Sequence, residues 1–300
     1  MTQLIHLTRR NAKLFFKDKG MFFTALITPM ILLVLYVTFL ANVYEDSFVQ
    51  LLSAFGITAE QSVLNGCVGG QLFSSLLSVS PITVAFCSNM LMVQDKVTGS
   101  YKDLTVTPVK TATMALSYYL ASFFSTMIIC LLAAGACFVY LWQVGWFFSM
   151  TDMLLMLLDT LVLVLFGTAF SAAVNVFLTS QGQISAVGSI VSACYGFICG
   201  AYMPISSFAD GLQKVLSFLP GTYGTSLMRN HSLQGVIAQL EADGLPAEGV
   251  TALRDLLDCN IYFFDHTVPV WGMYCVRGGC TLAVLGVYGG VTLWQIKRAK

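Results

Sequence analysis

The stretch Gln71-Leu-Phe-Ser-Ser-Leu-Leu-Ser-Val-Ser-Pro-Ile-Thr-Val-Ala-Phe-Cys-Ser-Asn-Met-Leu-Met-Val93 runs for 23 residues without a charged side chain. A helix rises about 1.5 Å per residue and the hydrocarbon core of a bilayer is roughly 30 Å thick, so about 20 apolar residues cross it. The stretch lacks the strict alternation of a barrel strand and exceeds the length of one. It therefore predicts a membrane-spanning helix.

The composition of the whole chain agrees with a membrane protein. Hydrophobic residues make up 57% of the 300 residues and charged residues only 10%, with a mean hydropathy of +0.78. A soluble domain carries about 25% charged residues. Fifteen Lys and Arg balance fifteen Asp and Glu, so the chain has no net positive charge with which to bind nucleic acid.

Five further runs of similar length hold at most one charge each. We therefore predict an all-α polytopic membrane protein that forms a single transmembrane domain over residues 1–300. Its six predicted spans cover residues 21–44, 71–93, 118–141, 153–178, 184–203 and 270–295.

The basic residues indicate how these spans are oriented. Eleven of the fifteen Lys and Arg residues lie before the first span, between the second and third, or after the sixth. Loops rich in Lys and Arg stay in the cytoplasm. We therefore expect a multi-pass protein of a bacterial cell membrane, with both termini cytoplasmic.

The segments between the spans carry further predictions. Residues 1–20 place Leu4, Leu7, Leu14 and Phe15 at helical spacing among basic residues, which predicts an amphipathic helix at the membrane surface. Residues 94–116 form a cytoplasmic loop. The external loop 204–269 contains semi-apolar segments that we expect to form short re-entrant helices in the outer leaflet; the alternative is an ordinary folded loop.

The sequence gives no sign of catalysis. It contains no G-x-x-x-x-G-K-[ST] loop to hold a nucleotide, and its three His residues lack metal-ligand spacing. We expect no enzymatic activity, no nucleotide-binding domain and no metal or other cofactor on this chain. Cys67 and Cys259 lie outside the predicted spans and either form a disulfide or remain free.

Two motifs resemble those of type-2 ABC transporter permeases. In the cytoplasmic loop, Asp95, Gly99, Leu104 and Pro108 match that family's order of a carboxylate, Gly-Thr, Leu and Pro, although Ser100 replaces Thr and Asp replaces Glu. After the fifth span, Cys199-Gly-Ala-Tyr-Met-Pro204 and the later Leu219-Pro-Gly-Thr222 are similar to its small-Gly and Leu-Pro-x-Thr segments.

The resemblance implies the transmembrane subunit of an ATP-driven exporter. Such chains sit in membrane lipid as a homodimer that forms the translocation path, and bind two copies of a separate ATPase subunit, which carries the ATP and magnesium. The resemblance assigns contact with that ATPase to Asp95, Gly99, Tyr101, Lys102, Leu104, Arg9, Arg10 and Lys13. The alternative role of the charged residues is to set the topology.

The resemblance also implies a substrate path along the second and fifth spans, lined by Ser78, Thr83, Asn89, Ser189, Ser192 and Tyr195. The alternative is that the Ser and Thr hydroxyls bond to their own helix backbone. Small residues four apart let helices approach closely in lipid. Gly188, Gly196 and Gly200 therefore predict close packing, either between two chains or within one.

Asp159 and Arg277 are the two charged residues inside the predicted spans. Intramembrane charges are costly, and pairing two of them reduces the cost. We expect an ion pair. Two other classes of protein remain open: an ion-gradient-driven secondary transporter, which should contain several buried carboxylates or broken spans, and a non-transporting membrane anchor or immunity protein.

Overall fold

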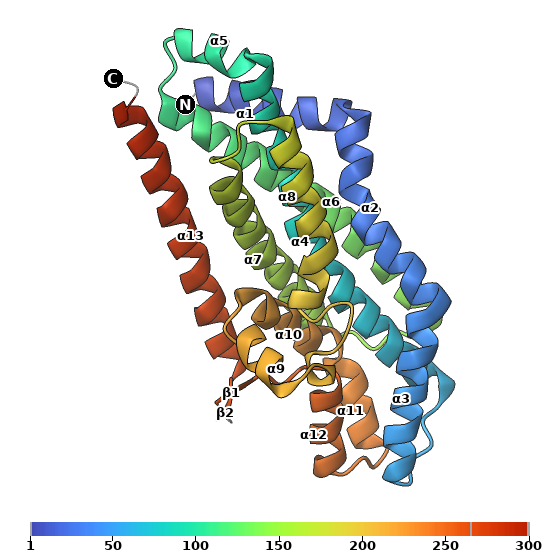
Figure 1. Cartoon of the computed structure of the whole chain (residues 1–300). Coiled ribbons are helices and arrows are strands. Elements are labelled where there is room, and N and C mark those ends of the chain that lie inside the picture. The colour runs from blue at the N-terminus through green and yellow to red at the C-terminus, as the bar shows by residue number, and fades with distance from the viewer. Residues whose placement is uncertain (1, 265, 299–300) are drawn as a thin grey trace.

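The chain folds into a bundle of long helices with smaller elements at one end, as Figure 1 shows. The computed structural model describes residues 2–264 and 266–298, without the side chains of residues 37 and 295–298. The longer helices are α1 (Thr2–Lys17), α2 (Lys19–Leu35), α3 (Ala41–Ala54), α4 (Gln61–Thr98), α6 (Thr111–Val144), α7 (Met150–Asn175), α8 (Gln181–Ile198) and α13 (Val270–Arg298). A π-helical turn, Tyr36–Leu40, joins α2 to α3.

The smaller elements lie at the two ends of the bundle. The short helix α5 (Ser100–Val106) lies at the end that also holds both chain termini (Figure 1). The opposite end holds α9 (Asp210–Leu216), α10 (Pro220–Ser232), α11 (Gln234–Ala242), α12 (Ala247–Leu256) and the hairpin of β1 (Tyr262–Phe263) and β2 (His266–Thr267). A 3₁₀ turn, Ile205–Ser207, precedes α9.

The structure confirms an all-helical membrane architecture and supports five of the six predicted spans by length and composition. Among the described residues, five helical segments are long and apolar enough to cross a membrane: Lys19–Ala54, Gln61–Thr98, Thr111–Val144, Met150–Asn175 and Val270–Trp294. The predicted span 184–203 corresponds to α8, which is not among them. Its 18 residues include Gln181 and Gln183 in the first turn and interspersed Ser and Gly, which make the helix less apolar.

Most helices extend beyond the predicted spans, because polar residues continue them past the hydrocarbon core. Helix α4 has 38 residues and begins ten positions before the predicted start at residue 71. Within the predicted loop 94–116, α4 continues to Thr98 and α6 begins at Thr111. Two helices start at capping boxes, in which Ser149 pairs with Asp152 and Ser180 with Gln183.

Helix α4 is the central element of the bundle. Its most apolar 18-residue window is 94% buried, whereas those of the other four candidate spans are 17–50% buried. It packs against α2, α6, α7, α8 and α10. The backbones of α4 and α7 approach closely at Pro81, whose carbonyl oxygen would lie 2.7 Å from a Cβ atom added at Gly167. Glycine at position 167 therefore allows the two helices to touch.

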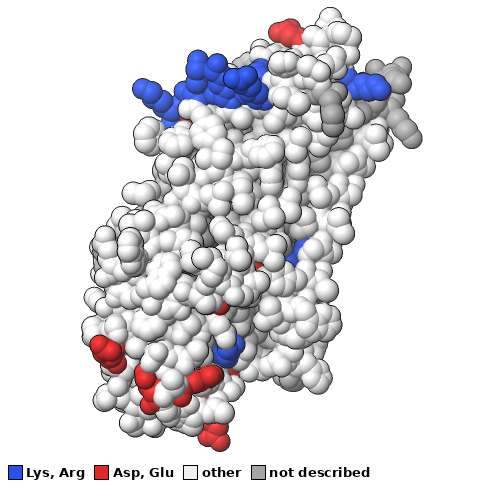
Figure 2. Space-filling view, turned by 180° about the vertical axis from the view of Figure 1, so that it is seen from behind, with Lys and Arg blue, Asp and Glu red and all other residues white. Residues whose placement is uncertain are grey.

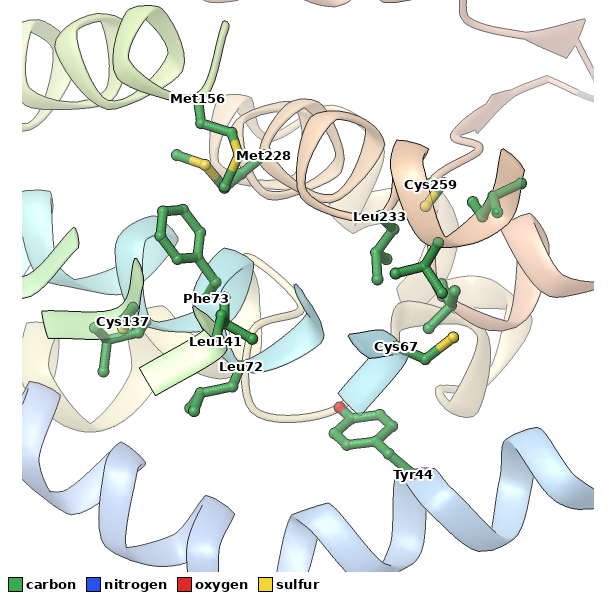
Figure 3. Packing of buried hydrophobic residues seen from close by; sticks show 14 of the residues in the cluster. Tyr44, Cys67, Leu72, Phe73, Cys137, Leu141, Met156, Met228, Leu233 and Cys259 are labelled. Atoms are coloured by element: carbon green, nitrogen blue, oxygen red, sulfur yellow. The ribbon is translucent and has the colours of Figure 1, made fainter. Parts of the chain in front are cut away.

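A cluster of buried side chains joins the half of the bundle opposite the termini to the smaller helices. Figure 3 shows Phe73 and Cys67 of α4 together with Leu233 and Cys259 from the segment after α8. Both cysteines are free thiols buried in this cluster. Of the two alternatives from the sequence, a disulfide or free cysteines, the structure shows free cysteines. Burial raises the pKa of Cys259 to about 12, so its thiol stays protonated at neutral pH.

The contact between Pro81 and Gly167 leads to a stability prediction. Gly167→Ala should lower the free energy of unfolding by about 1–3 kcal/mol, because the added methyl group pushes α7 away from α4. Thermal unfolding in detergent measures this change. Gly135→Ala on α6 is the matched control, since no described atom lies within 4 Å of its added Cβ, and it should not lower stability. Equal stability of the two variants would contradict the prediction.

Candidate functional site

A partly buried ion pair lies at the end of the bundle that holds both termini. Arg10 of α1 donates to Asp95 near the end of α4, with Nη1 2.6 Å from Oδ2 and Nη2 3.4 Å from Oδ1. The Asp95 side chain is 8% exposed and that of Arg10 is 33% exposed. Burial lowers the pKa of Arg10, but its hydrogen bond and Coulomb attraction to Asp95 outweigh burial and raise that pKa overall. The Arg10 guanidinium therefore stays charged.

Two more contacts extend this pair to α6. The Tyr118 hydroxyl donates to Asp95 Oδ2 at 2.5 Å, and Asn11 Nδ2 donates to Ser117 Oγ at 3.3 Å. We call Arg10, Asn11, Asp95, Ser117 and Tyr118 the inner bracket. It connects α1, α4 and α6, so these three helices are held as one unit beside α5.

Helix α5 is presented to solvent by this unit. None of its seven residues, all of which the structure describes, is buried, and Val106 is 87% exposed. Gly99 ends α4 with φ +86°, in the left-handed region that favours glycine, and its carbonyl caps α5 by accepting from the amides of Lys102 and Asp103. Partial burial raises the pKa of Tyr101, so its hydroxyl stays neutral.

The surface around α5 is basic. Figure 2 shows Lys and Arg gathered at this end of the molecule, and most of the Asp and Glu in that view at the opposite end. Arg9 and Lys13 of α1 are exposed there together with Lys102 of α5. Lys300 and the side chains of Lys297 and Arg298 lie outside the described structure.

The residues predicted to contact an ATPase therefore divide into two groups. Asp95 and Arg10 bond to each other, Asp95 is enclosed, and neither belongs to the most accessible surface. Arg9, Lys13 and Lys102 are exposed, while Tyr101 and Leu104 are half-buried. Sequence reasoning missed Tyr118, Asn11 and Ser117. The signal for Tyr118 is its position as a polar side chain at the start of an otherwise apolar span.

The polar residues predicted to line a path on α4 are enclosed within the chain. Ser78 Oγ donates to the backbone carbonyl of Ser74 at 2.6 Å, and Thr83 Oγ1 to those of Val79 and Ser80 at 3.3 Å. Asn89 Nδ2 contacts Ser171 Oγ at 2.5 Å on α7. These bonds agree with the alternative of backbone and interhelical bonding, so α4 presents no open polar face in the single chain.

The corresponding residues on α8 lie closer to the surface. Ser189 is exposed, Ser192 is half-buried and Tyr195 is buried. The Tyr195 hydroxyl has no hydrogen-bond partner among the described residues. Of the residues predicted to line a path, only those on α8 therefore offer polar groups at the outside of the chain.

The three glycines predicted to allow close packing, Gly188 and Gly196 of α8 and Gly200 after it, contact residues of the same chain. A Cβ atom added at Gly188 would lie 2.6 Å from Met90 Cε, and one added at Gly196 would lie 2.3 Å from the Tyr202 ring. Gly200 has φ +75° and an added Cβ would clash with Ile205. These contacts favour packing within one chain, which the sequence had left open beside packing between two chains.

The structure does not pair Asp159 with Arg277. Asp159 of α7 accepts from His231 Nδ1 of α10 at 2.6 Å through Oδ2, and from the Tyr274 hydroxyl of α13 through Oδ1. The expected ion pair is therefore wrong. The pattern of two charges in the spans could not reveal that a histidine of the external loop would reach Asp159.

Arg277 is held by other groups. Its side chain is fully buried, donates to the Pro220 carbonyl and lies 4.2 Å from the centre of the Phe166 ring. A guanidinium over an aromatic face is stabilised by the ring quadrupole. Its Nε and Nη2 atoms have no partner among the described residues. Arg277 thus fixes the start of α10 against α7 and α13.

A second buried ion pair, missed from the sequence, lies near the acidic end. Arg229 Nη1 is 3.0 Å from Asp258 Oδ2, and Nη2 donates to the Gly200 carbonyl at 2.6 Å. With its amide oxygen turned toward Arg229, Gln71 accepts from Nη2 at 3.0 Å. Asp258 adopts φ +49°, which its bonds to Arg229 and to the Ile205 amide hold in place. In the described part of the chain, no group of three or more His, Cys, Asp or Glu could hold a metal ion.

The inner bracket yields a stability prediction. Asp95→Ala should lower the free energy of unfolding by about 2 kcal/mol, because Arg10 and Tyr118 lose their shared acceptor. Tyr118→Phe is the matched variant and should cost about 1 kcal/mol, since Arg10 keeps its partner. Chemical unfolding in detergent measures both. An Asp95→Ala variant as stable as the parent chain would contradict the assignment.

The hydrogen bonds of Asp159 lead to a second stability prediction. Asp159→Ala should cost about 3 kcal/mol, because His231 and Tyr274 are left without their buried acceptor. Tyr274→Phe removes one of the two bonds and should cost about 1 kcal/mol. The exposed Asp46→Asn serves as the control. If Asp159→Ala unfolds at the same temperature as that control, the three residues do not form a stabilising cluster.

Comparison with known proteins adds to this geometry. The profile of the family described as ABC-2 type transporter matches residues 2–231, which include the inner bracket, α5, the candidate spans from α2 to α7, and most of α10. No curated protein and no solved structure gives a significant match. Since the matched region covers more than half of the chain, the protein belongs to the ABC-2 type transporter family.

Proposed function

We propose that the chain is the transmembrane subunit of an ATP-driven exporter, which works as a homodimer bound to two copies of a separate ATPase. One observation carries this proposal: Lys102, Asp103, Thr105 and Val106 of α5 are exposed at the basic end, while the inner bracket joins the neighbouring helices. Tyr101 packs against the bundle, but the exposed side chains of α5 have no packing role in the single chain, so we assign them to a partner. The sequence itself contains no nucleotide loop.

The arrangement of the bracket suggests how movement would be transmitted. A push on α5 passes through Gly99 to α4, whose most extensive contacts are with α2, α6, α7, α8 and α10. Because the bracket fastens α1 and α6 to α4, the same push moves all three helices. Helix α4 reaches the acidic end, where it packs against α10 and α11. A motion at the ATPase thereby reaches the opposite side of the membrane.

We further propose that α8 completes a six-span topology. Both ends of the chain lie at the same end of the bundle (Figure 1), and five crossings cannot bring a chain back to its starting side. The basic end is then cytoplasmic, and α9 and α10 are re-entrant helices at the outer leaflet. The exposed side of α8, with Ser189, faces the second chain and the substrate path.

The bonds of Asp159 favour this function over an ion-driven transporter. A proton or ion relay needs neighbouring acidic groups at depth. The described hydrogen bonds of Asp159 connect it to His231 and Tyr274 and to no second carboxylate. A membrane anchor without a transport cycle would not require α5 to be exposed, nor the inner bracket to join α1, α4 and α6 beside it.

Co-purification tests the proposed function. The affinity-tagged chain, expressed in its native host, should retain an ABC-type ATPase subunit and stimulate its ATP hydrolysis. Lys102→Glu combined with Val106→Asp on α5 should weaken retention at least about ten-fold, as expected for residues central to an interface. Both side chains are exposed, so folding should not change.

Glu241→Lys at the acidic end is the matched control, because it changes an exposed charge far from α5. It should retain the ATPase fully. Loss of the ATPase in the control, or its retention by the α5 variant, would contradict the proposed coupling surface. Transport that continues after ATP depletion and stops when the ion gradient is dissipated would contradict an ATP-driven mechanism.

A further inference from the structure

A hollow of about 560 Å³ opens at the acidic end, between α9, α10, α12 and the β-hairpin. Sites for small organic molecules commonly enclose 300–1,000 Å³. The hollow reaches inward to Cys199, directly after the last residue of α8. Neither the inner bracket nor the contacts of Asp159 involve its lining, so no role described so far explains it.

The floor of the hollow is electrically neutral. Arg229 and Asp258 line it and neutralise each other through their ion pair. The two carboxylate oxygens of Asp258 also accept from the backbone amides of Ile205 and Ser206. Arg229 and Asp258 make most of their hydrogen bonds within the protein, so we assign them a structural role rather than a role in binding.

The walls carry an excess of negative charge. The other charged residues of the lining are Asp210, Asp255 and Lys214. No ion pair joins Lys214 to either carboxylate among the described residues. One oxygen of Asp255 accepts from Asn260 at 2.7 Å and from the Tyr262 hydroxyl at 2.9 Å, which fixes the carboxylate at the wall. Two carboxylates against one ammonium favour a cation.

The rim of the hollow is aromatic. Phe218 and Phe264 line it, are 60% and 69% exposed, and have ring centres 6.0 Å apart at an angle of 83°. Exposed aromatic rings beside an acidic hollow can cover the apolar body of a ligand and attract its charge through the ring faces. A small inorganic cation would leave these rings uncovered.

We propose that this hollow binds a small organic cation with an aromatic or aliphatic body. The carboxylates of Asp210 and Asp255 attract the charge, and the rings of Phe218 and Phe264 cover the body. This site goes beyond the proposed function, because it lies at the end opposite to α5 and binding requires no ATPase. Because the hollow reaches Cys199, a molecule bound in it would lie next to the end of α8.

Fluorescence anisotropy with the purified chain in lipid nanodiscs tests the proposal. Rhodamine 6G, an aromatic cation, should bind saturably above the level of empty nanodiscs. Fluorescein, which has a similar ring system but is anionic at neutral pH, should bind at least about ten-fold more weakly. Equal binding of the two dyes, or no saturable binding of rhodamine 6G, would overturn the proposal.

Single substitutions then locate the site. Asp210→Asn and Asp255→Asn should each weaken rhodamine binding about five-fold, the effect of removing one partly exposed charge, and Phe264→Ala about three-fold. Lys214→Gln should strengthen it. Asp210 has no hydrogen bond or ion pair among the described residues, so its substitution leaves the fold intact even where Asp255→Asn disturbs Asn260 and Tyr262. Glu241→Gln, outside the lining, is the control and should not change binding.

Unchanged binding in both aspartate variants would overturn the proposal. This experiment and the co-purification experiment fail independently. Dye binding is measured without an ATPase, and ATPase retention without a dye. A chain that binds rhodamine 6G but retains no ATPase contradicts only the proposed function, whereas a chain that retains the ATPase but does not bind the dye contradicts only the hollow as a cation site.

Discussion

Hydrocarbon offers no hydrogen-bond partner, and this constraint determines the structure around α4. Helix α4 carries several Ser, Thr and Asn side chains within its span, and the surrounding helices of the chain enclose it. Ser78 and Thr83 return their bonds to their own backbone, whereas Asn89 reaches α7. The remaining helices can face lipid because they place most of their polar groups against this centre or at the membrane surfaces.

Three buried charged groups fasten the bundle at different depths. The Arg10–Asp95 pair joins α1 to α4 at the basic end, Asp159 joins α7 to α10 and α13, and Arg229 joins α10 to the segment after α12. Each is fixed by additional hydrogen bonds, as buried charges require. The short helices near the acidic end are therefore attached to the long helices by polar contacts as well as by the apolar cluster.

Run length and charge predicted the all-helical class and the positions of the long helices, because both properties act locally along the chain. They did not predict partners across the bundle. Which group meets Asp159 depends on how α7, α10 and α13 are rotated about their axes, and sequence spacing does not record this. For the same reason the inward packing of Gly188 could not be separated from packing between chains. Helix α8 was predicted as a span although its Gln, Ser and Gly residues make it less apolar than the others.

The left-handed backbone at Gly99 has a mechanical consequence. Helices α4 and α5 meet at one residue without a side chain, and an added Cβ there would touch no described atom. Such a joint bends easily, so it transmits compression along the chain but little torque. Rotation of α5 about its own axis would be absorbed by the backbone at Gly99. Only a displacement of α5 along the axis of α4 would reach the far side of the bilayer.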